Sequence, residues 1–174
     1  MPRTKRIAPG GMVFHALNRG VGRMKIFAGE RDYLAFEEAI EETLQLYPMR
    51  ILAYCIMPNH WHFLLWPEED GQLSAFLQRL TNTHTQRWHA HYRNVGRGHL
   101  YQGRYKSFPI AEDEHYLSVC RYVERNALRA GLTTKAELWP YGSLSLRAGI
   151  RKTGPTLSEG PVKLPRTWPV TGRR

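Results

Sequence analysis

Two histidines separated by one residue, His60 and His62, are the side chains in this sequence whose type and spacing best suit a metal ion. Side chains alternate across a strand, so two such imidazoles point to one face, roughly 7 Å apart at their Cα atoms. Two ligands leave the coordination shell of an ion incomplete, so a third protein group is needed. On spacing alone, ordinary polar positions at a sheet surface are the commoner explanation of such a pair.

A second candidate is Tyr122, which lies in a segment with the apolar spacing of a helix. At about 100° per residue, its neighbours on that helix face are all polar: His115, Ser118, Arg125, Asn126 and Arg129. Asn126, one turn further on, could supply the third metal ligand, and the two arginines could hold a phosphate. A tyrosine that attacks a phosphodiester needs such surroundings. With nine tyrosines in the chain, an amphipathic boundary position is the ordinary alternative for Tyr122.

The apolar pattern predicts the elements that must position these residues. Strands are predicted over 12–19, 49–57, 60–66 and 105–110, and helices over 30–47, 73–92 and from 113 toward 131. Only Pro58-Asn59 separates the second and third strands, so they should form an antiparallel hairpin. The order predicts an α+β, ferredoxin-like split βαβ fold, a mainly antiparallel sheet with helices packed on one face. The other face is then free to carry a site.

The length of 174 residues and an apolar content of 42% fit one domain. We expect a basic arm over 1–11, the catalytic domain over 12–148 and a basic, disordered tail over 149–174. No apolar stretch approaches the ~20 residues of a membrane span, and the first residues lack the apolar segment of a secretory signal. A cytoplasmic protein without a membrane partner is therefore expected. Cys55 and Cys120 lack the spacing of a zinc site and are expected in the core.

The formal net charge of +10 is unevenly distributed along the chain. The two ends, residues 1–25 and 147–174, supply +12, and the centre is slightly acidic. This distribution favours a protein that neutralises phosphates, with a solvated surface as the alternative. The candidate DNA contacts are Arg3, Lys5, Arg6, Arg19, Arg97, Arg104, Lys106, Arg125 and Arg129. Exposed aromatic rings such as Tyr101 or Tyr105 could stack on unpaired bases.

The block Pro58-Asn59-His60-Trp61-His62-Phe63 resembles the histidine–hydrophobic–histidine motif of the single-tyrosine HUH transposases. Five further blocks resemble, in the same order, those of the branch called REP-associated tyrosine transposases: residues 15–20, 101–106, 122–126, 129–132 and 139–141. The resemblance spans about residues 12–145. One departure is Ala127, where the branch usually has proline. Alanine predicts that the helix continues through Arg129.

This resemblance implies a metal-dependent single-strand DNA endonuclease and strand-transferase that acts on hairpin-forming repeated extragenic palindromes. It implies that His60, His62 and Asn126 bind Mg²⁺ or Mn²⁺, and that Tyr122 forms a 5′-phosphotyrosine and releases a 3′-hydroxyl. One tyrosine per chain can nick alone, but exchange of two strands is simpler with two active sites, so both a monomer and a homodimer fit. The bacterial nucleoid is the expected location. One alternative is a hairpin-binding architectural or regulatory protein without catalysis. Another is a metal-dependent hydrolase in which water replaces the tyrosine.

Overall fold

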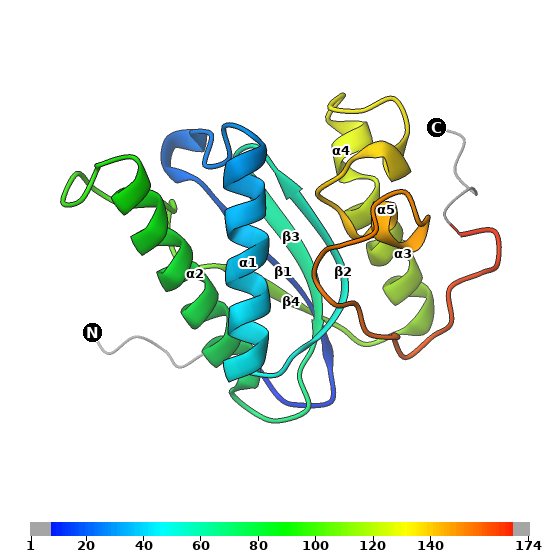
Figure 1. Ribbon diagram of the computed structural model, residues 1–174. Coiled ribbons are helices and arrows are strands. Elements are labelled where there is room, and N and C mark those ends of the chain that lie inside the picture. The colour runs from blue at the N-terminus through cyan, green and yellow to red at the C-terminus, as the bar shows by residue number, and fades with distance from the viewer. Residues whose placement is uncertain (1–7, 169–174) are drawn as a thin grey trace.

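Four strands form one antiparallel sheet in the order β2-β3-β1-β4 (Figure 1). The computed structural model describes residues 8–168, and its strands are β1 (Val13–Arg19), β2 (Arg50–Met57), β3 (His60–Trp66) and β4 (Lys106–Ile110). Helix α1 (Glu30–Leu46) joins β1 to β2, and α2 (Gln72–His91) joins β3 to β4. Because β3 lies between β1 and β2, the arrangement is a split βαβ unit. The predicted α+β, ferredoxin-like fold is confirmed.

Several shorter elements follow the sheet along the chain. They are α3 (Asp113–Glu124), α4 (Asn126–Arg129) and α5 (Ser143–Arg147), with a 3₁₀ turn at Ala136–Leu138. Another 3₁₀ turn, Val21–Arg23, lies between β1 and α1. Among residues 8–168, no helix combines the length and the apolar character that a membrane span requires.

One face of the sheet is covered by α1 and α2 (Figure 1). Strand alternation sends Trp61 and Phe63 of β3 to this face, where they pack in one cluster with Phe36 of α1 and Phe76 of α2. All four side chains are fully buried. Since Trp61 is held in this core, its two neighbours in sequence must point to the opposite face.

The opposite face is partly covered by α3, so it is less open than the sequence predicts. Cys120 and Val123 of α3 pack against Cys55 of β2 and Leu64 of β3. Both cysteines are buried and unpaired, as expected for core residues. Helix α3 contacts β2 and β3, so it brings its polar side over the part of the sheet that carries the two histidines.

The third helix does not continue to Arg129 as predicted. It ends at Glu124, and Arg125 leaves the helical conformation with ψ near 4° before the four-residue helix α4 begins. Alanine at position 127 permits a helix but does not impose one, because helix propensity is small beside tertiary contacts. Glu124 and Ala127 are both buried, so the turn between them is held by packing from both sides.

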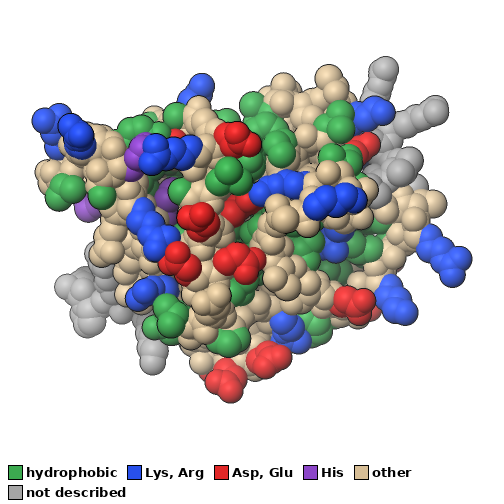
Figure 2. All heavy atoms as spheres, viewed as in Figure 1, with side chains coloured by type: hydrophobic (Ala, Val, Ile, Leu, Met, Phe, Trp, Pro, Cys, Tyr) green, Lys and Arg blue, Asp and Glu red, His purple; other side chains and the backbone are tan. Residues whose placement is uncertain are grey.

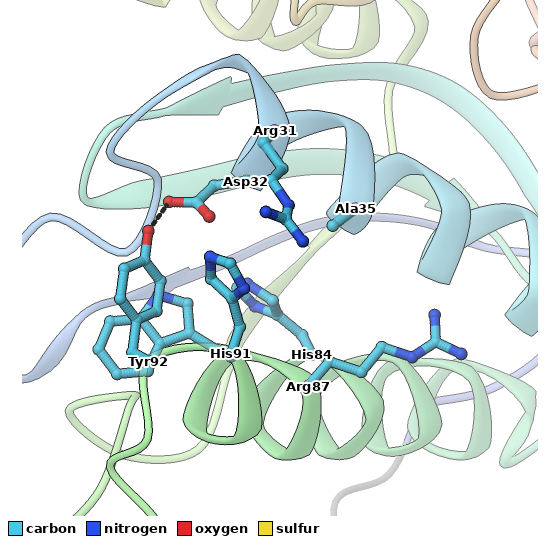
Figure 3. Close-up of a pocket in the computed structure, with 8 residues that line it drawn as sticks. Arg31, Asp32, Ala35, His84, Arg87, His91 and Tyr92 are labelled. Atoms are coloured by element: carbon cyan, nitrogen blue, oxygen red, sulfur yellow. Dashed lines mark hydrogen bonds between the residues drawn. The ribbon is translucent and has the colours of Figure 1, made fainter.

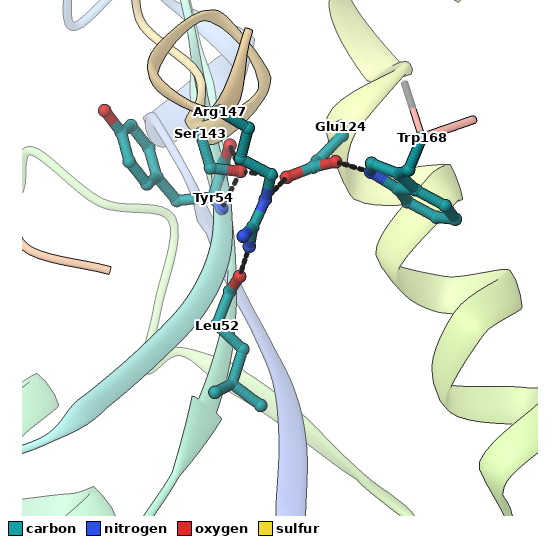
Figure 4. Close-up of polar contacts among 6 residues, drawn as sticks. All are labelled: Leu52, Tyr54, Glu124, Ser143, Arg147 and Trp168. Carbon is teal, nitrogen blue, oxygen red and sulfur yellow. Dashed lines mark hydrogen bonds and ion pairs between the residues drawn. The ribbon is translucent and has the colours of Figure 1, made fainter. Parts of the chain in front are cut away.

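Glu124 is the centre of a buried polar cluster at the end of α3 (Figure 4). Its Oε1 accepts hydrogen bonds from Ser143 Oγ (2.6 Å) and Arg147 Nε (2.8 Å), both on α5. Its Oε2 accepts one from Trp168 Nε1 at 2.7 Å. Arg147 also donates to the backbone oxygen of Leu52 on β2. The end of α3 is therefore fixed to the sheet and to the far C-terminal part of the chain.

Residues 149–168, here called the C-terminal strap, contain no helix or strand but lie against the domain. Arg151 forms an ion pair with Glu37 of α1, and Ser158 donates its N–H to the Ile51 oxygen at 2.8 Å. The expectation of a disordered tail therefore does not describe this part of the range 149–174. The low apolar content of the strap predicts disorder, but a few apolar side chains, such as Leu164 and Trp168, pack against the core.

The strap and the segment before it also close one edge of the sheet. Ile56 of β2 donates its N–H to Tyr141 O at 2.8 Å, and Cys55 forms an isolated bridge with Gly142. Together with Ser158, these contacts satisfy backbone groups on the outer side of β2. At the other edge, β4 has no further strand beside it among the described residues.

Candidate active site

The pairing of β1 with β3 brings three histidines to one place on the sheet. His60 lies opposite Arg19, and His62 lies opposite Leu17, so residues 15, 17 and 19 share the face of the two predicted histidines. The third histidine is His15, whose ring stacks on His62 with centroids 5.1 Å apart. The rings of His60 and His62 lie edge to face at the same 5.1 Å.

Each of the two predicted histidines uses its Nδ1 in a hydrogen bond. His60 Nδ1 lies 2.6 Å from Asn59 Oδ1, and because an amide oxygen can only accept, Nδ1 carries the proton. His62 Nδ1 lies 2.9 Å from His15 Nε2. In both rings, Nε2 is then the nitrogen left to bind a ligand. Metal-binding histidines typically use one ring nitrogen for the metal and the other for such an orienting hydrogen bond.

All three rings are uncharged near neutral pH. Burial lowers the pKa of His60 to about 4, and the positive charge of Arg19 adds to the effect. Burial lowers the pKa of His62 to about 3, with smaller contributions from His60, His15 and Arg19. Burial also lowers the pKa of His15 to about 4. A neutral imidazole is the form that binds a metal ion.

Tyr122 projects from α3 over this histidine cluster. Its ring meets His62 edge to face at 5.9 Å and His15 at 6.1 Å between centroids. The side chain is 39% exposed, so its hydroxyl-bearing ring remains accessible from solvent. Arg129 of α4 places its guanidinium carbon 5.0 Å from the centre of the same ring. The structure thus brings Tyr122, His62 and the guanidinium of Arg129 together.

Asn126 opens α4, directly after the interruption of the helix. Its side-chain nitrogen is buried without a hydrogen-bond partner within residues 8–168. A half-turn of the amide exchanges its nitrogen and oxygen, so either atom can occupy that position. Among the described residues, no three His, Cys, Asp or Glu side chains form a cluster that could hold a metal ion. Two imidazoles and an amide oxygen would be a mixed donor set that Mg²⁺ and Mn²⁺ both accept.

The predicted basic contacts are distributed unequally around the cluster. Arg19 and Arg129 lie beside it, and Lys106 of β4 pairs with Leu17 one strand away. Arg104 is exposed just before β4, and Arg125 is half-buried at the helix interruption. Arg97 is exposed in the loop after α2, and no contact in residues 8–168 links it to the histidines. Arg3, Lys5 and Arg6 lie outside the described residues.

Sequence reasoning missed two residues at the site and misjudged two others. It missed His15, although the alternation of residues 15, 17 and 19 could have shown its shared face with Arg19. It also missed Phe108 of β4, whose ring is 52% exposed and lies 6.4 Å from His15 between centroids. Tyr101 and Tyr105 are not exposed stacking rings, because both are buried.

Comparisons with known proteins agree with this fold. The family model described as "Transposase IS200 like" matches residues 10–126. A Haemophilus influenzae protein named "Putative REP-associated tyrosine transposase" is 26% identical over 121 residues, which cover 64% of this chain and 69% of that protein. A solved structure of a REP-associated tyrosine transposase bound to a REP hairpin aligns with 100% of this chain and 98% of that chain. Its TM-score is 0.68 at 21% sequence identity, so it shows a shared fold.

Proposed function

Because the chain belongs to the IS200-like transposase family, we propose that it nicks and rejoins single-stranded or hairpin-forming DNA with Tyr122 as the nucleophile. The observation that carries the proposal is the packing of Tyr122 over His62 and His15, which unites a nucleophile with metal-competent imidazoles. Similarity to a REP-associated relative and to a hairpin-bound structure supports repeated extragenic palindromes as the substrate.

The proposed reaction exchanges one phosphodiester for another. The Tyr122 oxygen attacks a backbone phosphorus, the bond from phosphorus to the 3′ oxygen breaks, and a 5′-phosphotyrosine forms. The phenol of Tyr122 gives up its proton as the new bond forms, and the departing 3′ oxygen takes one up and becomes a hydroxyl, so no net proton is gained or lost. A 3′-hydroxyl from the same or another strand then attacks the phosphotyrosine, which restores the phosphodiester and the tyrosine.

The histidine pair and Asn126 would hold the cation, Mg²⁺ or Mn²⁺. His60 and His62 would bind through Nε2 and Asn126 through its amide oxygen, since each of these groups has an atom that the protein leaves unused. A bound divalent cation neutralises the non-bridging phosphate oxygens and stabilises the leaving oxygen. His15 orients the ring of His62 through the bond to its Nδ1.

The DNA would lie along the face that carries Tyr122. Arg129 and Arg19 flank the cluster and would bind the phosphates on either side of the scissile bond. The exposed ring of Phe108 would stack on an unpaired base, in the role expected of Tyr101 and Tyr105 from the sequence. The other basic candidates, from Arg3 to Arg125, would contact the backbone without reading the base sequence.

The test is a covalent trapping experiment. The protein is incubated with end-labelled hairpin oligonucleotides, taken from palindromes beside the gene, in Mg²⁺ or Mn²⁺, and the products are separated on a denaturing gel. Wild-type protein should retain label in a covalent adduct, and Tyr122→Phe should not. Tyr47→Phe is a matched control, because Tyr47 has the same 39% exposure at the end of α1.

Other outcomes identify the alternatives. An adduct that survives Tyr122→Phe contradicts the assignment of the nucleophile. Cleavage that His60→Ala abolishes and Tyr122→Phe preserves identifies a metal-dependent hydrolase. Salt-sensitive hairpin binding without cleavage in any metal identifies a binding protein, which the basic ends of the chain would also serve. Light scattering with and without the hairpin decides whether the active form is a homodimer.

A further inference from the structure

A cavity lies on the other side of the sheet from Tyr122, between the start of α1 and the end of α2. It encloses about 170 Å³ and is lined by Arg31 and Asp32 from α1, and by His84, Trp88 and His91 from α2, with Tyr92 after it. Figure 3 shows the side chains of Arg31, His84 and His91 pointing toward one another across the space between the helices. None of these residues takes part in the proposed nicking reaction.

A buried chain of hydrogen bonds fixes the orientation of His84. Trp61 Nε1 can only donate, and it donates to the Tyr101 hydroxyl oxygen at 2.9 Å. The same hydroxyl lies 2.6 Å from His84 Nδ1. If Tyr101 donates its own proton to Nδ1, every donor of this buried chain has an acceptor, and leaving one unpaired would cost free energy. His84 therefore accepts at Nδ1.

The remaining proton of His84 is then on Nε2, the ring edge that faces the cavity. The side chain is only 5% exposed, and burial lowers the pKa of its ring to about 3, so it carries a single proton at neutral pH. Its ring stacks on Phe27 with an interplanar angle of 6°, which holds its direction. Within residues 8–168, Nε2 has no hydrogen-bond partner. The cavity thus contains a fixed N–H donor without an acceptor.

Apart from the Asp32 carboxylate, the polar groups that line this cavity are cationic or can donate a hydrogen bond. Arg31 has no ion pair with any carboxylate in the described part of the chain. The nearest carboxylate, Asp32, uses its Oδ2 to accept from the Tyr92 hydroxyl and the Ala28 N–H. In Figure 2, Lys, Arg and His side chains gather at this end of the helices, and Asp and Glu side chains lie beside them along α1. Such a set of donors matches an anion with several acceptor oxygens.

We propose that this cavity, through Arg31, His84 Nε2 and His91, binds a phosphate group of the DNA at a distance from the nicked bond. The phosphate oxygens accept from the three side chains, and the rings of Trp88 and Tyr92 form an apolar wall for the attached sugar. This proposal rests on the proposed function, in which the ligand is DNA. The hydrogen-bond chain ends at Trp61, which lies between His60 and His62. We therefore expect phosphate binding to change the environment of the Trp61 indole on the strand that carries the histidine pair.

The first test uses inorganic phosphate alone and the indole N–H signals of the five tryptophans in ¹⁵N-labelled full-length protein. Phosphate is titrated at constant ionic strength with chloride. The Trp88 and Trp61 signals should shift and saturate, and Arg31→Gln should weaken binding about tenfold. Arg31 is exposed, so the variant should fold, and the exposed Arg79→Gln on α2 is the control with an equal change of charge. The absence of saturation, or equal effects of both variants, overturns the site.

The second test asks whether DNA is the source of the phosphate. Arg31→Gln should weaken hairpin binding several-fold relative to Arg79→Gln, and inorganic phosphate should compete with the hairpin. If phosphate binds but the hairpin affinity is equal in both variants, the site serves free phosphate and the DNA assignment is overturned. The Tyr122 adduct is measured in parallel at saturating hairpin. Wild-type protein that forms the adduct but binds no phosphate refutes this inference alone, and wild-type protein that binds phosphate but forms no adduct refutes the nicking activity alone.

Discussion

His15 is a residue whose role depends on one hydrogen bond. Its Nε2 lies 2.9 Å from His62 Nδ1, so it selects which nitrogen of His62 faces a ligand. Groups that orient metal ligands in this way typically change metal affinity by about 10- to 100-fold when removed. His15→Ala should therefore weaken Mn²⁺ binding by this factor in a titration followed by electron paramagnetic resonance. The exposed His115→Ala on α3 should leave the affinity unchanged, and equal affinities in both variants would show that His15 is not needed.

His84 should make the stability of the protein depend on pH. Its folded pKa is about 3, below the ordinary value of 6.5, so the unfolded chain binds a proton over that interval and the folded chain does not. His84 alone should therefore contribute about 1 kcal/mol per pH unit to the fall of the free energy of unfolding as pH drops from 6 to 4. In urea titrations across this range, His84→Gln should flatten the dependence relative to His115→Ala. A slope unchanged by the substitution would contradict the assignment.

For single residues, the sequence predicts which side chains belong to a site better than it predicts which other residues lie beside them. His60, His62 and Tyr122 are recognisable from spacing and from the resemblance, and Tyr122 does lie over His62. His15 could not be assigned, because its role arises only when β1 pairs with β3. Tyr101 seemed exposed because it stands in a basic, Gly-rich segment, yet its hydroxyl bridges Trp61 and His84 inside the core.

The end of α3 depends on Glu124, a buried carboxylate with donors from α5 and the C-terminal strap. Removing one partner of a buried ion pair typically costs about 3 kcal/mol, whereas an exposed pair contributes under about 1 kcal/mol. Arg147→Met should therefore lower the free energy of unfolding in urea by about 3 kcal/mol. Arg87→Met, which breaks the exposed pair with Glu42, is the control and should cost little. Similar losses in the two variants would mean that the Glu124 cluster carries no special share of the stability.

The sequence predicts the elements well where apolar periodicity is strong and poorly where single contacts decide. The hairpin of β2 and β3 and the two long helices follow from their patterns. The interruption at Arg125 does not, because nothing in the local sequence reveals that Glu124 is held by Ser143 and Arg147 from a later element. The position of Asn126 relative to Tyr122 is therefore a tertiary property.

For the whole molecule, the basic ends should govern how salt affects DNA binding. Arg3, Lys5 and Arg6 lie in the N-terminal arm, and each phosphate contact adds somewhat less than about one unit to the salt dependence of the affinity. Replacing all three with Gln should lower the slope of log affinity against log salt by about two to three units, as measured by fluorescence anisotropy with a labelled hairpin. Parallel lines for wild type and variant would show that the arm does not contact the backbone.

The C-terminal strap shows the limit of composition as a guide to order. Residues 149–168 are rich in Gly, Pro and charge, which favours disorder in isolation. Their contacts are nevertheless specific: an ion pair of Arg151 with Glu37, a backbone bond from Ser158, and the indole of Trp168 on Glu124. Such contacts are few and separated in sequence, so no window average reveals them.

The unequal edges of the sheet determine how two copies of the chain could exchange or add strands. The outer side of β2 already hydrogen-bonds to Tyr141 and Ser158, so it cannot accept a strand from another molecule without losing these contacts. Only β4 offers free backbone groups among the described strands, and there Pro109 lacks an N–H and Lys106 adds charge. Continuous sheets between copies are thus disfavoured at both edges, and a protein with strong apolar strands is protected from aggregation through them.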